Sequence, residues 1–486
     1  MKSNKTWKAI TTLLVIAMLA GCQKGGSGES DKTSSEIPNS ENSGSRTSSG
    51  GGDKLGLNPG QEIYDKTLVY DTSAEPYNVA IKINETKEVK EASSGRHKTE
   101  SGEVANIDGV INFAGSFLSK LGDGEKKITI TFSDNTTKAI DAFIATKIIR
   151  TAQDFQDINE NLQGTYILGN DIDFAKFGNF EPLGYYLDET NPKNSYFHGI
   201  LEGNGYSLKN MKVQYNSSLT NNEEAYSGFG MFEHESHVNG DNIGVFQIIG
   251  SSGVVRNVVF DGVRVRGRTI VGVIAGNVMG TVYNCIVTEK SSVEMSTHFY
   301  DNDCNSGLAF GIVAGSGVVE NVITLSSSIK TPDIYMDFGD DYAGKIGNGW
   351  DHSNVPGNTD DWWQFANVNR DDELDSNGSK SNGLYSFAGK VWGTVRNSIG
   401  LSFDITPFNG EKRTINFAQT HLASIKPTSG PEDLGTLENC KVKTAEELKD
   451  PATFDASYGF DTTVFDFTAD YLPGLIAPQL TYTIAE

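Results

Sequence analysis

The chain has 486 residues and a formal net charge of −23, and its length exceeds that of one ordinary domain. Such acidity excludes nucleic acid as an expected partner, because phosphate binding needs a basic footprint. The abundance of Gly, Asn, Asp, Val, Ile and Phe favours strands and turns, so we expect an all-β protein.

A short basic and apolar segment comes first. Lysines precede an apolar run over residues 9–20, which is shorter than the roughly 20 residues that span a bilayer. The run ends in Leu19-Ala20-Gly21-Cys22, which resembles the lipobox of bacterial lipoproteins. That resemblance implies a signal peptide over residues 1–21, acyl chains such as palmitate on Cys22, and a cell-surface location outside the cytoplasm. The membrane is therefore an expected partner through the N-terminal lipid.

Residues 22–57 consist mainly of Gly, Ser, Asn, Thr, Glu and Lys. A segment with so few apolar side chains cannot bury enough surface to offset the entropy of ordering. We expect a disordered tether, because Gly/Ser-rich chains behave as flexible coils.

Residues 58–147 alternate apolar and polar side chains, for example in Leu68–Asp71, Val110–Phe113 and Lys127–Asp134. Alternation of this kind predicts strands with one buried face, and several such strands in a short stretch predict a small β-sandwich. Tyr70-Asp71 and the run Phe117–Leu121 resemble parts of the immunoglobulin-like X module of cellulosomal proteins. The resemblance implies a spacer or weak polysaccharide-contact module.

A repeat, Gly-x-Val/Leu-x-Asn followed by an apolar or small residue, marks the rest of the chain. Its asparagines are Asn257, Asn284, Asn321, Asn397 and Asn439, with a looser copy at Asn210. Asparagine tolerates a left-handed turn and can both donate and accept hydrogen bonds, so we expect stacked coils with bonded asparagines. The residues expected to face inward are Val258, Cys285, Val322, Ser398 and Cys440.

The repeat and its lead-in from Ile149 resemble the GLUG-repeat proteins of bacterial surfaces. The resemblance implies a right-handed parallel β-helix over residues 148–486. One departure is Gly272-Val-Ile-Ala-Gly276, which replaces the usual Gly-Leu-x-Gly element. We expect a capping helix after Ile149, a short helix within residues 443–451 and a C-terminal cap on the last coil.

An insertion at residues 331–382 contains most of the tryptophans. Trp350, Trp362 and Trp363, together with Tyr342, lie among many acidic residues. Indole faces beside carboxylates suit sugar rings, which predicts a glycan-binding loop. The same tryptophans could instead form a satellite core beneath a long loop, and the sequence leaves both interpretations open.

The sequence gives only weak indications of a metal site or of reactive cysteines. The acids Asp371, Asp372 and Asp375 are calcium candidates, although their spacing fits no calcium loop and favours a solvated acidic loop. We therefore expect no cofactor, with calcium as the alternative. The histidines form no zinc-peptidase motif. Cys304 lies in a polar stretch and could pair with another cysteine.

These features predict a non-enzymatic, surface-anchored lipoprotein for adhesion or glycan binding. The partner would be a polysaccharide or a glycan on a host or neighbouring surface. The alternative is a polysaccharide lyase or glycoside hydrolase on the same scaffold. A hydrolase needs paired carboxylates and a lyase needs acids beside a basic residue. We expect the acids to lie outside the repeat strands, which favours the first hypothesis.

Overall fold

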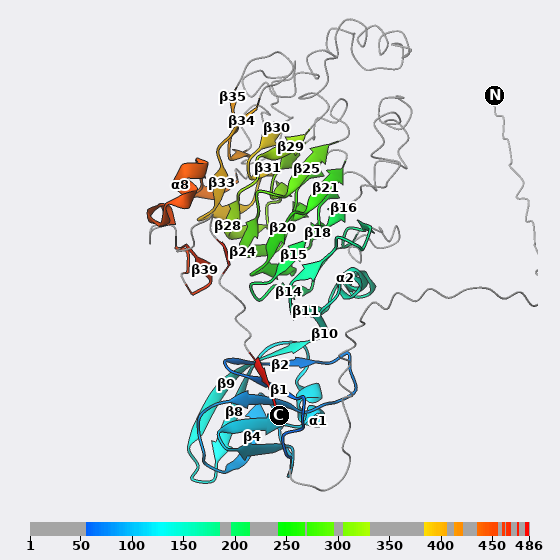
Figure 1. Cartoon of the computed structure of the whole chain (residues 1–486), viewed down its shortest axis with the longest axis vertical. Helices are drawn as coiled ribbons and strands as arrows, with labels where there is room; N and C mark the ends of the chain where they lie inside the picture. The colour runs from blue at the N-terminus through cyan, green and yellow to red at the C-terminus, as the bar shows by residue number, and fades with distance from the viewer. Residues whose placement is uncertain are drawn as a thin grey trace, which may run out of the picture. The chain divides into compact units, whose positions relative to one another are not determined.

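The computed structural model describes residues 55–184, 196–213, 242–267, 270–295, 305–330, 383–405, 413–420, 435–454, 459–461, 463–467, 474–475 and 482–485. The described residues are mainly strands with a few short helices, which confirms the all-β prediction (Figure 1). None of the described helices is long and apolar enough to span a membrane. We call residues 55–146 the N-terminal module and residues 147–443 the repetitive region.

The N-terminal module contains two mainly antiparallel sheets. The first has the order β41 (Tyr482–Ile484), β1 (Glu62–Tyr64), β3 (Val79–Lys82), β7 (Val110–Phe113) and β6 (Val104–Ile107). The second has the order β2 (Thr67–Asp71), β9 (Thr137–Ala145), β8 (Gly124–Phe132), β4 (Val89–Ser94) and β5 (His97–Lys98). A short helix, α1 (Gly115–Leu118), continues into a 3-10 turn, η1 (Ser119–Leu121).

One hydrophobic core joins the two sheets of the module. Ile81 and Phe113 come from the first sheet, while Leu68 and Ile130 come from the second. The alternating sequence explains this arrangement, because successive side chains of a strand point to opposite faces. The core also includes Ile167 of the repetitive region, so the module packs directly onto the first coil.

The repetitive region is built from parallel strands. Its long sheet contains 13 strands in two limbs. The first limb contains β10 (Lys147–Ile149), β11 (Thr165–Leu168), β14 (Ile200–Glu202), β19 (Val254–Arg256), β32 (Thr394–Arg396) and β37 (Thr436–Glu438). The second contains β12 (Ile172–Asp173), β15 (Ser207–Lys209), β20 (Val259–Asp261), β33 (Ile399–Leu401) and β38 (Lys441–Lys443). β24 (Thr281–Val287) and β28 (Val318–Thr324) run through both limbs.

Three further parallel sheets complete the coils. The β21 sheet contains β13 (Asn179–Phe180), β16 (Lys212–Val213), β21 (Arg264–Gly267), β25 (Ser292–Met295) and β29 (Ser328–Lys330). The β22 sheet contains β17 (Asn242–Ile243), β22 (Ile270–Val271), β26 (Asn305–Gly307) and β30 (Gly383–Tyr385). The β23 sheet contains β18 (Phe246–Ile249), β23 (Ala275–Val278), β27 (Phe310–Val313), β31 (Ala388–Val391) and β36 (Ala418–Thr420).

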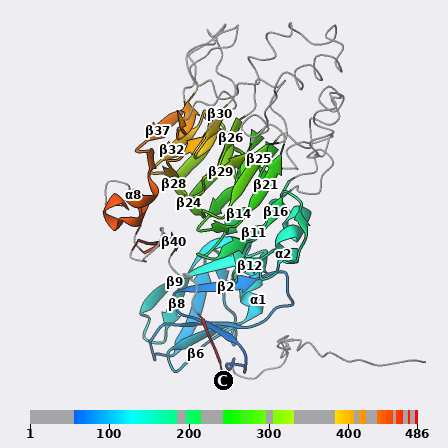
Figure 2. The same cartoon turned by 45° about the horizontal axis from the view of Figure 1, so that its top comes forward.

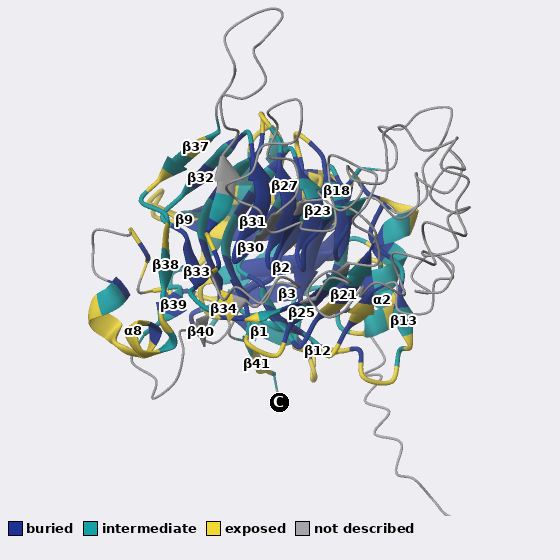
Figure 3. Ribbon diagram, turned by 90° about the horizontal axis from the view of Figure 1, so that it is seen from above, coloured by how far each residue is buried: buried dark blue, intermediate teal, exposed yellow. Residues whose placement is uncertain are grey.

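The chain visits these sheets in a recurring order, and we call one passage through them a coil. Figure 2 shows the stacked strands of successive coils. Equivalent residues therefore become direct neighbours. Val255 pairs with Val282, and Val282 pairs with Val319. All three side chains are fully buried, and they belong to one core that extends through the coils (Figure 3). Stacking thus supplies the apolar partner that a single coil lacks.

The repeat asparagines lie where the two limbs of the long sheet meet. Asn257, Asn284, Asn321, Asn397 and Asn439 all have a positive φ, between 47° and 56°. This confirms the predicted left-handed conformation. The inward positions are confirmed as well: Val258, Cys285, Val322 and Ser398 are fully buried, and Cys440 is partly buried.

The looser repeat copy occupies a different corner from the one expected. Asn210 also has a positive φ, but it follows β15 and its Nδ2 donates to Asp173 Oδ1 at 2.9 Å. Asn204, between β14 and β15, takes the place where the limbs meet and has a φ of 55°. The turn between β14 and β15 contains two more residues than the next one, between β19 and β20, so sequence spacing alone assigned the wrong asparagine.

Glycines allow the coils to approach closely at the β22 and β23 sheets. A Cβ on Gly272 would lie 2.4 Å from the Phe310 Cα, and one on Gly276 would lie 2.5 Å from the Asn242 carbonyl carbon. Gly311 has the same role one coil later. The altered element Gly272-Val-Ile-Ala-Gly276 thus keeps a glycine at each of two close contacts between backbones.

Short capped helices flank the coils, as the sequence predicted. In α2 (Ala152–Gln156), Thr151 and Asp154 form a capping box, and a 3-10 turn, η2 (Asp157–Glu160), follows. In α8 (Ala445–Lys449), Thr444 and Glu447 form another. Each box satisfies amide groups that the first helical turn leaves without partners.

The C-terminal segment does more than cap the last coil, which corrects the sequence-based expectation. After α8 come η6 (Pro451–Phe454), β39 (Phe465–Asp466) and β40 (Gly474–Leu475). Leu448, Phe454 and Phe465 cluster with Ile286 and Ile323 on the outer face of the long sheet. β41 then pairs antiparallel with β1 and so completes a sheet of the N-terminal module (Figure 1). The predicted boundary of the repetitive region at residue 486 is therefore wrong.

We predict that Gly311→Ala destabilises the protein by about 1–3 kcal/mol, because the new methyl group overpacks a close contact. It would lie 2.5 Å from Ile270 Cγ2 and 2.6 Å from the Gly276 carbonyl oxygen. Gly315→Ala is the matched control, since a Cβ there meets nothing within 4 Å. Urea unfolding should show a control change within about 0.5 kcal/mol. Equal stability of the two variants would contradict the close packing.

Candidate functional site

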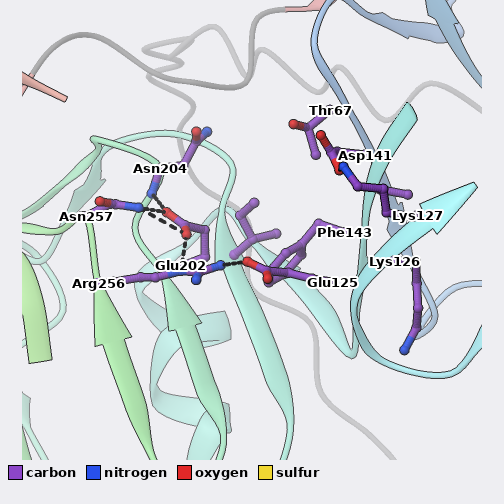
Figure 4. Close-up of a pocket in the computed structure, with 12 residues that line it drawn as sticks. Thr67, Glu125, Lys126, Lys127, Asp141, Phe143, Glu202, Asn204, Arg256 and Asn257 are labelled. Carbon is purple, nitrogen blue, oxygen red and sulfur yellow. Dashed lines mark hydrogen bonds and ion pairs between the residues drawn. The ribbon is translucent and has the colours of Figure 1, made fainter. Parts of the chain in front are cut away.

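A cleft of about 510 Å³ lies between the N-terminal module and the first coils (Figure 4). Strands β2, β8 and β9 contribute Thr67, Glu125, Lys126, Lys127, Asp141 and Phe143. The repetitive region contributes Ile167, Glu202, Asn204, Arg256 and Asn257. The volume falls in the range of small-molecule sites, and the walls combine three acids with three bases.

Arg256 is the centre of a network that crosses the cleft. Its Nε lies 2.5 Å from Glu202 Oε2, and its Nη1 donates to Tyr283 Oη at 2.6 Å. Its Nη2 pairs with Glu125 of the N-terminal module. Dashed lines in Figure 4 join the Arg256 side chain to Glu202 and to Glu125. One side chain therefore links three strands of the long sheet and one strand of the module.

Glu202 also ends a ladder of asparagines. Asn257 Nδ2 donates to its two carboxylate oxygens at 2.9 and 3.2 Å. Asn284 donates to Asn257 at 3.1 Å, and Asn321 donates to Asn284 at 3.4 Å. The predicted bonding between coils is confirmed for these residues. The ladder is interrupted before Asn397, which donates to Glu320 at 3.4 Å, and resumes between Asn439 and Asn397.

The electrostatics of the network favour a fixed positive charge. Burial alone would lower the pKa of Arg256, but the charge of Glu202 and the hydrogen bonds to Glu125 and Tyr283 outweigh it and raise that pKa. The pKa of Tyr283 is also raised, mainly by burial. Arg256 therefore holds its neighbours in place as a cation and is unsuited to proton transfer.

Several acids lie on repeat strands, contrary to our expectation. Glu202, Glu320 and Glu438 occupy equivalent strand positions beside the corner, as do Arg256, Arg396 and the uncharged Tyr283. The side chains alternate in charge, and Arg396 Nε lies 2.8 Å from Glu438 Oε2. In the sequence this row corresponds to the variable position before each repeat asparagine. The strand register was needed to show that these residues are neighbours.

The other site residues suggested by the sequence lie outside the described residues. These are Cys22, Tyr342, Trp350, Trp362, Trp363, Asp371, Asp372, Asp375 and Cys304. Within the described part of the chain, no group of three or more His, Cys, Asp or Glu side chains could hold a metal ion.

The two described cysteines have free thiols within the coils. Burial raises the pKa of Cys285 to about 12 and that of Cys440 to about 11. A thiol reacts as its thiolate, so both cysteines are poor nucleophiles at neutral pH. They agree with the expected role of small side chains packed inside the coils.

Three long segments connect the same pair of sheets. Val213, Met295 and Lys330 end strands of the β21 sheet, and the described chain resumes at strands of the β22 sheet that begin with Asn242, Asn305 and Gly383. Stacked strands lie about 4.8 Å apart. The described strand ends that flank residues 214–241, 296–304 and 331–382 therefore lie along one corner.

No known protein family, curated protein or solved structure matches this chain.

We predict that Arg256→Ala lowers the free energy of unfolding by about 3–5 kcal/mol, because it leaves the Glu202 carboxylate without its charge partner. The Glu202 side chain is only 12% exposed. Arg396→Ala is the matched control in the same row, where the Arg396 and Glu438 side chains are 43% and 53% exposed. Urea unfolding should give a control loss of at most about 1 kcal/mol. Similar losses of stability in both variants would show that the Arg256–Glu202 pair stabilises the fold no more than the exposed Arg396–Glu438 pair does.

Proposed function

We propose that this protein is a non-enzymatic lipoprotein, anchored at the cell surface through Cys22, that binds glycans or mediates adhesion. The anchor rests on the lipobox-like sequence that ends at Cys22. The fold we propose for the repetitive region is a right-handed parallel β-helix. For the N-terminal module we propose an immunoglobulin-like sandwich that acts as a spacer.

The sheet connections support these fold assignments. Parallel pairs such as β19–β24 and β24–β28 recur from coil to coil, as expected when each turn of a solenoid stacks on the last. In the module, two sheets share one core, as in sandwiches. The GLUG-repeat resemblance is consistent with the left-handed corner residues.

The observation that carries the functional proposal is that three insertions leave and rejoin the described strands at one corner. Insertions in repeat proteins map to loops on one face, which is often the binding face. The segment 331–382 contains Trp350, Trp362 and Trp363 among acidic residues. These side chains offer aromatic surfaces and hydrogen-bond acceptors, which together suit sugar rings.

The alternative, a polysaccharide lyase or glycoside hydrolase, draws on the acids and arginines of the repeat strands. Glu202 and Glu125, however, both pair with Arg256, so neither is a free carboxylate of a hydrolytic pair. Arg256 keeps its proton and cannot act as a base. The described residues therefore favour binding over catalysis.

We expect the purified full chain, kept in mild detergent, to bind a subset of glycans on an array. Trp362→Ala with Trp363→Ala should weaken that binding, because the indole faces would stack on sugar rings.

In cells, Cys22→Ser should move the chain from the membrane fraction to the soluble fraction, since it removes the acylated thiol.

Trp392→Ala is the matched indole control, because Trp392 is partly buried and lies between β31 and β32, outside the segment 331–382. Its glycan binding should match the wild type if the variant remains folded by circular dichroism. Release of shortened products from a polysaccharide panel would contradict the non-enzymatic proposal and support the alternative.

A further inference from the structure

Two rows of outward-facing side chains run along the first limb of the long sheet. The first follows the strand register through Glu202, Arg256, Tyr283, Glu320, Arg396 and Glu438. The second, beside it, runs through Val254, Thr281, Val318, Thr394 and Thr436. We call the two rows together the outer track.

The outer track begins in the cleft and becomes more accessible along the coils. The side chain of Arg256 is 16% exposed, whereas those of Arg396 and Glu438 are 43% and 53% exposed. Thr281 and Thr394 are partly exposed, and Thr436 is exposed. The second limb differs, because Leu448, Phe454, Phe460 and Phe465 cover its outward apolar row. The first limb thus presents the polar face.

The functional groups of the track repeat with a fixed spacing. Neighbouring strands lie about 4.8 Å apart, so one set of groups recurs with each coil. This distance is comparable to the length of one sugar unit in an extended polysaccharide. The track offers hydroxyls, carboxylates and guanidinium groups, which hydrogen-bond to sugar hydroxyls, and valine surfaces, which contact apolar C–H faces.

The charges on the track select the class of ligand. On the track itself the acids Glu202, Glu320 and Glu438 outnumber Arg256 and Arg396. The whole chain is also strongly acidic. Like charges are repelled from such a surface. An acidic polysaccharide is therefore disfavoured, whereas a neutral polysaccharide is not repelled.

We propose that the outer track binds one extended chain of a neutral polysaccharide, which enters the cleft at Arg256 and runs across the stacked strands toward Glu438. This inference rests on the proposed glycan-binding function but assigns it a site apart from the tryptophan segment. The ligand crosses the strands, so each coil contacts a successive part of the polymer.

The test combines Thr281→Val, Thr394→Val and Glu320→Gln in the full chain. These changes keep side-chain size and strand preference, and they remove two hydroxyls and one charge from the middle of the track. The matched control is Thr129→Val, Thr131→Val and Glu91→Gln, which changes the same residue types on β8 and β4, where Glu91 pairs with Thr131. Affinity electrophoresis in soluble glucan, mannan, xylan and alginate measures Kd.

The proposal predicts binding to at least one neutral polysaccharide, weakened by about tenfold or more in the track variant and unchanged in the control. Affinity for matching oligosaccharides should rise with their length across several units. Unchanged binding in the track variant, combined with loss in Trp362→Ala/Trp363→Ala, would overturn the track alone and leave the proposed function standing. Stronger binding to alginate than to every neutral chain would also overturn it, and absence of any binding would overturn both.

Discussion

The left-handed turn at one asparagine per coil determines how the repetitive region is ordered. Asn257, Asn284, Asn321, Asn397 and Asn439 bend the chain between the two limbs of the long sheet at a positive φ. Most residues pay a steric penalty there, whereas asparagine tolerates it. Because its amide can bond to the asparagine of the adjacent coil, the same side chain favours both the bend and the stacking register.

The positions of the inward and outward rows of side chains follow from that register. Inward residues such as Val255, Val282 and Val319 meet in the core, and the residues before the corner form the outward charged row. Glycines at the β22 and β23 sheets let successive backbones approach, so an added methyl group there would overpack the contact. The ladder is interrupted between Asn321 and Asn397, the coils that flank the segment 331–382.

The local pattern of the sequence predicted much of this fold. The corner asparagines, the inward residues and the two capped helices follow from spacing and capping rules, which depend on neighbouring residues. The cleft and the pairing of β41 with β1 join residues far apart in the chain, so no local pattern revealed them. Asn204 escaped notice because its turn is longer than the next one, between β19 and β20. The tryptophan segment remains a prediction.

The most direct test of the register is a disulfide across the segment 331–382. Val318 and Thr394 are paired residues on adjacent strands, both partly exposed on the outer track. Adjacent strands are about 4.8 Å apart, within the range for a disulfide. Val318→Cys/Thr394→Cys should therefore form a bond, detected by peptide mapping without reductant, while Thr281→Cys/Thr394→Cys, two strands apart, should not. A bond in the second pair and none in the first would contradict the stacking described for these coils.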